Sequence, residues 1–426
     1  MDMDAILKYG NETVTLPIRG AASIEYINPD EMYELPDLEA ALRRGLEQDM
    51  IASAPLKELI TPEDPVTIVV SDITRSWMHQ GDILTLLGHY LHEEMGLPFE
   101  NITVLVALGT HRKSTPEEHR VIAGDYLYER CTVLDHDCDG PCTLIGETSR
   151  GTHVRVNPLA VGRKVIVVGG TVHHMMAGFG GGRKNILPGI ASRETIRENH
   201  SRALDPNRPH SDDRVGCGLL SQNPIHEDMD EAAALLDTTF SINIVVAASG
   251  RHSGLFCGKL HEAWLASCDY QRKCYEKWID HEADVVICSS GGAPKDMNLY
   301  QGCKGMLNGM RALKPGGEML WLCKCPEGCG APDYTAWLTP LKEGRLDEAL
   351  RADFTIGGFI FYLTVETLRK GSCRILTTID SETAGPMGMQ ACTSPEQLLE
   401  GMDFTGKRVY VIPYAGSVVP MLQENS

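Results

Sequence analysis

Short, β-rich apolar runs alternate with longer helical stretches along this chain, and this alternation restricts the fold more than any other feature. Buried strands are expected at Val66–Ser71, Ile102–Ala107 and Arg163–Val168. A helix is expected over residues 82–95, and another should begin at Thr115, a candidate N-cap followed by proline and two acidic residues. Strands that alternate with helices indicate an α/β fold, with a mainly parallel sheet flanked by helices.

A second unit is expected to begin near Asp284. It should contain strands at Asp284–Ser289, Glu318–Leu322 and Arg408–Ile412 and a helix at Met297–Ala312. The stretch from His261 to His281 is expected to be one long helix leading into this unit. At 426 residues and about 150 residues per domain, the chain has room for two or three domains. We expect an N-terminal domain over residues 1–275, a C-terminal domain over 276–426, and a cleft between them.

Charge and composition exclude several functional classes. Lys and Arg number 39 against 58 Asp and Glu, which gives a net charge of −19. A chain this acidic repels polyanions, so we expect no extended nucleic-acid binding. The N-terminus lacks the basic-then-apolar pattern of a secretory signal, and no apolar run approaches the ~18 residues that cross a bilayer. We therefore expect a cytoplasmic protein without a membrane segment.

The 14 cysteines are scattered along the chain, as expected for reduced intracellular thiols. Two groups of cysteines that lie close together in sequence allow another interpretation, a metal site. Cys323, Cys325 and Cys329, or Cys138 and Cys142, could hold zinc or an iron–sulfur cluster, although neither group has the CxxC pairs of common zinc modules. The first group makes a redox or metal-storage protein an alternative function.

Reactive side chains gather in four segments, most of which also contain glycine. Each of these segments follows an expected strand. They are Ser71–Arg75, Leu108–Arg112, Thr171–Gly189 and Gly291–Lys304. Ligands of open α/β sheets bind beyond the carboxyl ends of the strands. The four segments together therefore indicate one site.

The third segment contains a glycine-rich turn around Gly181 and Gly182. Glycine permits positive φ, and successive backbone N–H groups in such a turn can bind phosphate, with Arg183 and Lys184 adding positive charge. The turn does not match the Walker A pattern, because Arg183 precedes the lysine and Asn185 follows it. A tight turn without a ligand is the alternative interpretation.

Three histidines accompany these segments: His111, His174 and His200. Histidines at loop edges near basic groups suit proton transfer, since the unperturbed pKa is about 6.5, or metal ligation. No HExxH spacing marks a zinc hydrolase. Arg75 and Lys304 are candidate ligands of a substrate carboxylate, since arginine offers a two-donor fork and lysine a point charge.

In their order along the chain, these motifs resemble the nickel-dependent lactate racemase family. The strings that carry the resemblance are Ser71-Asp72-x-Thr74-Arg75, Gly109-x-His111-Arg112, His174-x-x-Ala177-Gly178-Phe179-x-Gly181-Gly182-Arg183-Lys184, Leu187-Pro188-Gly189-Ile190-Ala191-Ser192, Asn199-His200-Ser201 and Tyr300-Gln301-x-x-Lys304-Gly305-Met306. They extend over residues 71–306. Six ordered motifs are far more specific than any one of them.

The resemblance implies a 2-hydroxyacid racemase or epimerase with its active site in the interdomain cleft and with the nickel-pincer nucleotide as cofactor. It implies that Lys184 carries this nucleotide through a thioamide bond and that His200 is a nickel ligand. His111 and His174 would be the paired acid–base residues. The cofactor side would include Asp72, Thr74, Gly181, Gly182 and Arg183, and the substrate side Arg75, Lys304, Gln301, Tyr300 and Phe359. Separate maturation proteins would load the cofactor.

The resemblance also fits the difficulty of the reaction. A C–H bond beside a hydroxyl and an ionised carboxylate is very weakly acidic, so direct proton abstraction faces a large barrier. A hydride acceptor avoids the carbanion: hydride leaves C2 while one histidine takes the hydroxyl proton, and hydride returns to the other face. Each histidine is expected to contribute on the order of 10²–10⁴-fold.

Substrate choice is where this sequence departs from the lactate enzymes. Ala293 and Lys295 stand where the family pattern leads us to expect Tyr and Leu, and Met175 and Met176 replace aromatic residues after His174. Lost bulk and an added lysine favour a larger polar substrate, such as malate, 2-hydroxyglutarate or a sugar acid of the gluconate type. Lactate itself stays an alternative, as does a non-catalytic homologue that binds nickel or nucleotide.

Overall fold

The computed structural model describes residues 1–330 and 334–423. The chain forms two compact units. The N-terminal unit consists of Glu31–Ala203 and Asp213–Arg272, and the C-terminal unit of Met1–Asp30, Leu204–Asp212 and Lys273–Ser426. Each unit is built around its own six-stranded, mainly parallel sheet, which confirms the expected fold class.

The sheet of the N-terminal unit has the strand order β13-β12-β9-β4-β5-β6. All neighbouring pairs are parallel except β12 with β13. The strands are β4 (Val66–Ser71), β5 (Ile102–Ala107), β6 (Thr132–Asp135), β9 (Lys164–Gly170), β12 (Thr238–Val246) and β13 (His252–Gly258). Strand order reverses between β4 and β9, because the chain moves outward from β4 to β6 and then returns to the other side of β4. This topological switch point is where ligands of such sheets bind.

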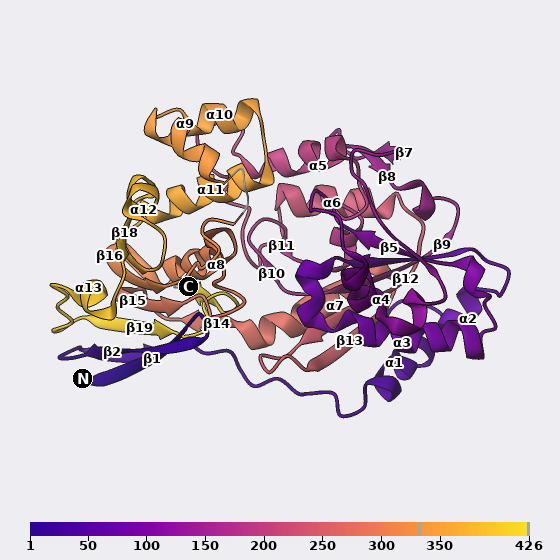
Figure 1. The fold of residues 1–426 in the computed structure, drawn as a ribbon, viewed down its shortest axis with the longest axis horizontal. Helices are drawn as coiled ribbons and strands as arrows, with labels where there is room; N and C mark the ends of the chain where they lie inside the picture. The colour runs from indigo at the N-terminus through magenta and orange to yellow at the C-terminus, as the bar shows by residue number, and fades with distance from the viewer. Residues whose placement is uncertain (331–333, 424–426) are drawn as a thin grey trace. The chain divides into compact units, whose positions relative to one another are not determined.

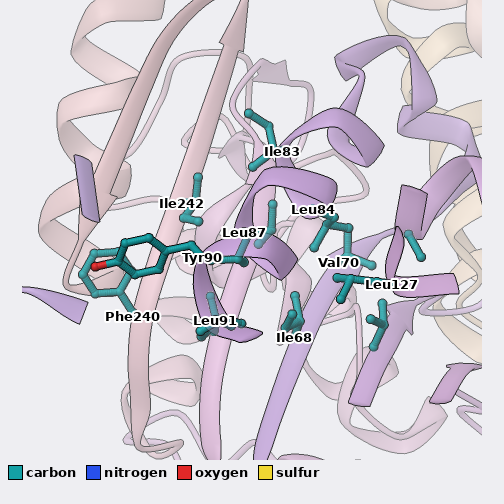
Figure 2. Packing of buried hydrophobic residues seen from close by; sticks show 14 of the residues in the cluster. Ile68, Val70, Ile83, Leu84, Leu87, Tyr90, Leu91, Leu127, Phe240 and Ile242 are labelled. Atoms are coloured by element: carbon teal, nitrogen blue, oxygen red, sulfur yellow. The ribbon is translucent and has the colours of Figure 1, made fainter. Parts of the chain in front are cut away.

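The first expected strands are confirmed, because β4 and β5 coincide with their predicted ranges and are buried at every residue. Their continuous apolar sequences are explained by this two-sided burial. Helix α3 (Gln80–His89) packs Ile83, Leu84 and Leu87 against the sheet, as Figure 2 shows. Thr115 caps α4 (Pro116–Tyr128) in a full capping box with Glu118, as its sequence predicted.

The other elements of the N-terminal unit complete its helical layers and add small hairpins. Its other helices are α1 (Leu38–Glu47), α2 (Leu56–Leu59), α5 (Arg193–His200), α6 (Pro224–Ala234) and α7 (Leu260–Tyr275). Its two-stranded sheets are β7 (Thr143–Glu147) with β8 (His153–Val156), and β10 (His173–His174) with β11 (Gly178–Phe179). The last pair lies within the glycine-rich segment.

The C-terminal unit has the sheet order β18-β17-β16-β15-β19-β3, in which every pair is parallel. These strands are β3 (Ser23–Tyr26), β15 (Ala283–Ser289), β16 (Leu313–Leu322), β17 (Ser372–Leu376), β18 (Met389–Cys392) and β19 (Arg408–Ile412). A second topological switch point lies between β15 and β19. The helices of this unit are α8 (Leu299–Arg311), α9 (Leu338–Lys342), α10 (Leu346–Ala352), α11 (Ile356–Leu368), α12 (Ser381–Met387) and α13 (Pro395–Leu399).

The structure divides the chain differently from the expected domains 1–275 and 276–426. Residues 1–30 belong to the C-terminal unit. Strand β3 pairs with β19, and the hairpin of β1 (Met3–Tyr9) and β2 (Glu12–Ile18) buries Leu7 and Leu16 in the same core as strands β15 and β16. Local apolar patterns predict a strand but not the sheet that it joins, which is why the sequence led to the wrong assignment.

The predicted helix from His261 to His281 was too long. Helix α7 ends at Tyr275, and β14 (Glu276–Ile279) then pairs in parallel with β20 (Val419–Leu422). This partner strand lies more than a hundred residues away in sequence, so nothing local indicates it. Among the described residues, no helix is both long and apolar enough to span a membrane.

Candidate active site

Three of the four predicted segments leave adjacent strands of the N-terminal unit at the same edge. Ser71–Arg75 follows β4, Leu108–Arg112 follows β5, and Thr171–Gly189 follows β9. Asn185 links two of these strands, since its Nδ2 donates to the Val168 carbonyl (2.8 Å) and its Oδ1 accepts from Ser71 Oγ (3.0 Å). The switch point therefore carries a cluster of the predicted functional residues. The fourth segment belongs to the C-terminal unit.

His111 is held by Asp72. The Nδ1 atom of His111 lies 2.6 Å from Oδ2 of Asp72, while the His111 side chain is 47% exposed and that of Asp72 only 6%. Thr74 Oγ1 donates to the other oxygen of Asp72 at 2.6 Å. Because a carboxylate only accepts, Nδ1 of His111 carries the proton and the Nε2 lone pair of a neutral ring is left to act as a base.

The carboxylate form of Asp72 is favoured by these contacts. Burial by itself would raise the pKa of Asp72, but the hydrogen bond and charge of His111, together with the Thr74 hydroxyl and the charge of Arg75, leave that pKa below its ordinary value. The sequence suggested that Asp72 and Thr74 shape a cofactor pocket. In the structure they contact His111, Arg75 and each other.

Arg75 lies on the short 3₁₀ helix Ile73–Met78 that follows Asp72. Its Nη1 donates to Thr74 Oγ1 at 3.1 Å and to the Thr74 carbonyl at 3.3 Å. No carboxylate among the described residues lies within ion-pair distance of Arg75. Its guanidinium is therefore available to an anionic ligand beside the His111–Asp72 pair.

The glycine-rich turn is fixed by helix α7. Gly181 and Gly182 have φ of 72° and 50°, which favours glycine, and a Cβ on Gly182 would meet the ring of Trp264 at 2.6 Å. Trp264 Nε1 donates to the Gly180 carbonyl at 2.8 Å, and Thr171 Oγ1 lies 2.7 Å from Ser267 Oγ. The local sequence does not predict this role of Trp264, because Trp264 lies some eighty residues from the turn.

Arg183 is a buried residue of the glycine-rich turn. Its side chain is 1% exposed, with the guanidinium 3.6 Å from the Trp264 ring centroid. Nε donates to His226 Nδ1 at 2.9 Å, and Nη2 to the Ala177 carbonyl at 2.7 Å. These contacts with Trp264, His226 and Ala177 stabilise the glycine-rich turn. They do not support the expectation that Arg183 lends its charge to a bound phosphate.

Lys184 and His200 lie near each other although they are sixteen residues apart. Burial, and then the positive charge of Lys184, lowers the pKa of His200 to about 3, so that its ring is neutral. Nδ1 of His200 lies 3.1 Å from the Ile196 carbonyl and therefore carries the ring proton. The Nε2 lone pair is left as a possible metal ligand in a fixed orientation.

A buried carboxylate that the sequence did not reveal supports the helix end carrying His200. Asp228 is 0% exposed and accepts from Asn199 Nδ2 (2.8 Å), Thr148 Oγ1 (2.6 Å) and Thr152 Oγ1 (2.8 Å). Arg202 Nε lies 3.4 Å from the same carboxylate. Asp228 therefore fixes the residues on both sides of His200. No motif or spacing distinguishes it from the other 57 acidic residues.

His174 has the opposite proton arrangement to His111. Its Nδ1 accepts from the backbone N–H groups of Met176 and Ala177, both at 3.2 Å. The proton of the neutral ring is therefore on Nε2. Met175 and Met176 are buried, at 6% and 1% exposure.

The fourth segment is organised by helix α8 in the C-terminal unit. Asn298 caps this helix by accepting from Gln301 N, and Lys304 Nζ donates to Gln301 Oε1 at 2.7 Å. The Tyr300 ring packs edge-on against Tyr334, with 6.0 Å between centroids. Phe359, which the family resemblance places on the substrate side, lies in α11 at 0% exposure.

The cysteine groups show no metal site in the part of the chain that the structure describes. Cys323 and Cys325 are fully buried, with their sulfur atoms 3.4 Å apart. Among residues 1–330 and 334–423, no three His, Cys, Asp or Glu side chains are arranged to hold a metal ion. The expectation of a zinc or iron–sulfur centre at Cys323, Cys325 and Cys329 thus gains no support from the geometry.

Comparison with known proteins identifies the family. Residues 9–211 match the lactate racemase N-terminal domain, and residues 279–352 match the lactate racemase C-terminal domain. The chain is 33% identical over 308 residues to the lactate racemase of Thermoanaerobacterium thermosaccharolyticum, which covers 72% of this chain and 70% of that protein. It is 32% identical over 306 residues to the lactate racemase of Lactiplantibacillus plantarum, with 70% of each chain covered.

Solved structures agree with this result. The lactate racemase apoprotein from Thermoanaerobacterium thermosaccharolyticum matches with a TM-score of 0.85 and 27% identity, over 99% of this chain and all of that chain (100%). A protein from Thermotoga maritima, 18% identical with a TM-score of 0.65 over 92% of this chain and 100% of its own, shares the fold. The chain therefore belongs to the lactate racemase family.

Proposed function

We propose that this chain inverts the C2 centre of a 2-hydroxy acid. The observation that carries the proposal is the His111–Asp72 pair, which leaves His111 Nε2 as an oriented base on an exposed side chain. A base of this kind suits removal of the proton from a substrate hydroxyl. The names of the relatives, both lactate racemases, support the same class of reaction.

The carboxylate of the substrate has two proposed ligands, as the family resemblance implies. Arg75 has no acidic partner among the described residues and can offer two parallel N–H donors to a carboxylate. Lys304 is directed by its hydrogen bond to Gln301. These contacts would fix C2 and its hydroxyl relative to the histidines, which is worth more to the rate than the binding itself.

The residues around Lys184 suit the nickel-pincer nucleotide that the family resemblance implies. Lys184 would hold the nucleotide through its side-chain nitrogen, and the neutral His200 would offer Nε2 to nickel. A single protein histidine completing a metal–cofactor complex requires no cluster of three protein ligands. When bound, this cofactor supplies a hydride acceptor, so that the C–H bond at C2 is broken without a free carbanion.

The protein groups then handle the protons. His111 Nε2 takes the hydroxyl proton as C2 becomes planar, and Asp72 stabilises the imidazolium that forms. To donate its Nε2 proton to the substrate oxygen from the other side, His174 would have to be an imidazolium, because a neutral ring that gave up this proton would become an imidazolate. Protonation at Nδ1 gives up the contacts from Met176 and Ala177. In the reverse direction the ring is neutral with its proton on Nδ1, and Nε2 accepts the hydroxyl proton.

The substrate we propose is larger and more polar than lactate: malate, 2-hydroxyglutarate or a sugar acid. Lys295 supports this choice, because it adds a charged donor in the segment that leads to Tyr300 and Gln301. The alternative is lactate itself, which the names of the relatives favour. Kinetics with lactate, malate, 2-hydroxyglutarate and gluconate would decide between them.

The experiment that tests the proposed function compares wild type with Lys184→Ala, both co-produced with cofactor-maturation proteins. Intact-protein mass spectrometry and nickel analysis should show an adduct of nucleotide mass and one nickel on wild type alone. His111→Ala should keep the adduct and lose racemisation of every 2-hydroxy acid. Absence of the adduct, when a lactate racemase loaded alongside carries it, would identify a homologue that lost the activity.

A further inference from the structure

The switch point of the C-terminal unit carries a pair of lysines. The β15–α8 connection contributes Lys295, and the loop after β19 contributes Gly416 and Ser417. A third strand, β1, contributes Lys8, which lies near its end. Since strand order reverses between β15 and β19, this edge is where a ligand of this sheet is expected.

Backbone contacts hold the end of β1 on the β15–α8 connection. Ser289 Oγ donates to the Lys8 carbonyl at 2.5 Å, and Ala293 N donates to the Gly10 carbonyl at 2.9 Å. Gly10 N in turn donates to Asp296 Oδ2 at 2.7 Å. These hydrogen bonds therefore hold Lys8 beside this loop, although Lys8 is nearly three hundred residues from Lys295 in sequence.

The two lysine side chains lie along the same glycine loop. A Cβ on Gly292 would meet Lys8 Cβ at 2.9 Å, and a Cβ on Gly291 would meet Lys295 Cδ at 3.3 Å. Lys8 Nζ lies 5.7 Å from the ring centroid of Tyr414. Lys295 Nζ donates to Ser417 Oγ at 2.5 Å. Both ammonium groups thus belong to one local site, and both lysines are exposed.

Neither ammonium is neutralised. No carboxylate in the described ranges lies within ion-pair distance of Lys8 or Lys295, in a chain that carries a net charge of −19. The adjacent Asp296 is 0% exposed and directs Oδ2 to the N–H groups of Gly10 and Lys324. Desolvation, and then the charge of Lys8, lowers the pKa of Lys295.

We propose that Lys8, Lys295 and Ser417 form an anion site that binds the second carboxylate of a dicarboxylic 2-hydroxy acid. This inference rests on the proposed function and selects malate or 2-hydroxyglutarate over a sugar acid, whose far end carries no charge to balance two lysines. The connection that bears Lys295 continues directly into α8 with Gln301 and Lys304. A hydrogen bond also links the start of this connection to α8, since Ser290 Oγ donates to the Gly302 carbonyl at 2.9 Å.

The test uses Lys8→Leu and Lys295→Leu, with Lys342→Leu as the control. Lys342 is an exposed lysine at the end of α9 in the same unit. Loss of one charged hydrogen bond should lower kcat/KM for malate relative to lactate by about tenfold or more in each test variant. The control should keep the wild-type ratio, and Lys295→Arg should restore most of it. An equal loss on both substrates would overturn the proposal.

A binding experiment separates this inference from the proposed function. Calorimetric titration of the whole protein with succinate, which has two carboxylates and no hydroxyl, requires no turnover. We expect succinate to bind wild type and Lys342→Leu, and to bind Lys8→Leu and Lys295→Leu at least tenfold more weakly. Inorganic phosphate binding as tightly as succinate would overturn the dicarboxylate assignment in favour of a phosphate site. Succinate binding without racemisation of any 2-hydroxy acid would overturn the proposed function and leave this site intact.

Discussion

The two switch points of this molecule have the same topology and opposite chemistry. In the N-terminal unit, the reversal between β4 and β9 presents histidines whose orientations are fixed by carboxylates and carbonyls. In the C-terminal unit, the reversal between β15 and β19 presents lysines that have no acidic partner within the described part of the chain. Topology therefore determines where a ligand can bind, whereas the side chains on a few loop residues determine which ligand it is.

The two regions also differ in how they are supported. The histidine site depends on buried side chains contributed by distant helices, such as Asp228 of α6 and Trp264 of α7. The lysine site depends on hydrogen bonds between Ser289, Ala293 and Asp296, which lie in one short segment, and the backbone at the end of β1. Substitutions should therefore disturb the first site through lost packing and unpaired polar groups, and the second mainly through loss of charge.

The largest effect should come from His111. His111→Ala removes the proposed base, so kcat should fall on the order of 10²–10⁴-fold, with the cofactor adduct unchanged in mass spectrometry. His153→Ala is a matched control, because His153 is 46% exposed and lies 3.2 Å from Glu198, much as His111 is paired to Asp72. Similar losses in both variants would mean that any histidine–carboxylate pair in this unit affects activity and would remove the special role of His111.

Asp228→Ala should produce the largest loss of stability. It leaves Thr148, Thr152 and Asn199 without their buried acceptor, and we expect about 3 kcal/mol less free energy of unfolding. Urea unfolding followed by tryptophan fluorescence measures this change. The control, Glu231→Ala, breaks a more exposed ion pair with Arg150 and should cost less than about 1 kcal/mol. A loss no larger than the control's would mean that Asp228 does not support the histidine site.

Asp296→Ala tests the support of the lysine site. This variant removes the buried acceptor of Gly10 N, and we expect about 2 kcal/mol of local destabilisation. Hydrogen exchange should speed up in β1 and β2 and stay unchanged in β4 and β5. Glu12→Ala, which removes an exposed partner of Lys324, is the control. Unchanged protection of the hairpin in Asp296→Ala would show that backbone contacts alone hold β1 in place.

The smallest expected effect is the loss of folding stability in acid that is caused by His226. Burial, and then the charge of Arg183, lowers the pKa of His226 to about 3, while Asp230 opposes the shift and His261 adds to it. The folded pKa lies below the unfolded value near 6.5, so the unfolded state binds the proton first and stability falls as pH drops from about 6.5 toward 3. Below pH 6 this group should cost about 1 kcal/mol of unfolding free energy per pH unit.

His226→Gln isolates that contribution, because the amide oxygen can still accept from Arg183 Nε but does not titrate. Hydrogen exchange of α6 between pH 6.5 and 4.5 should weaken less steeply with acid in this variant than in wild type. The measurement bears on the comparison between the units, since burial lowers the pKa values of His136, His200, His226 and His252, all of which belong to the N-terminal unit. Equal slopes for wild type and variant would contradict the assignment.

Much of the fold follows from local sequence. The ranges of β4 and β5 and the Thr115 cap are fixed by short apolar runs and by a first-turn proline, and each is confirmed. The placement of three reactive segments at one sheet edge follows because parallel strands share the direction of their carboxyl ends. These features depend on residues within one turn or one strand, which is why the sequence predicts them.

The remaining features depend on partners far away in sequence. β3 joins a strand 385 residues later, Arg183 is buried by a tryptophan from α7, and Asp228 bonds to residues up to 80 positions away. Side-chain type alone suggested that Arg183 adds charge near a phosphate, and it gives no indication that the guanidinium stacks on an indole ring of α7. Only the three-dimensional arrangement shows that contact.

The incorporation of β1, β2 and β3 into the C-terminal unit has a consequence for biosynthesis. The ribosome releases β3 roughly 380 residues before its partner β19, so at 5–20 residues per second it waits on the order of 20–80 s for the strand that pairs with it. During that time the hairpin has an unburied apolar face carrying Leu7 and Leu16. The N-terminal unit can fold early in translation, whereas the lysine site can assemble only after nearly the whole polypeptide has emerged.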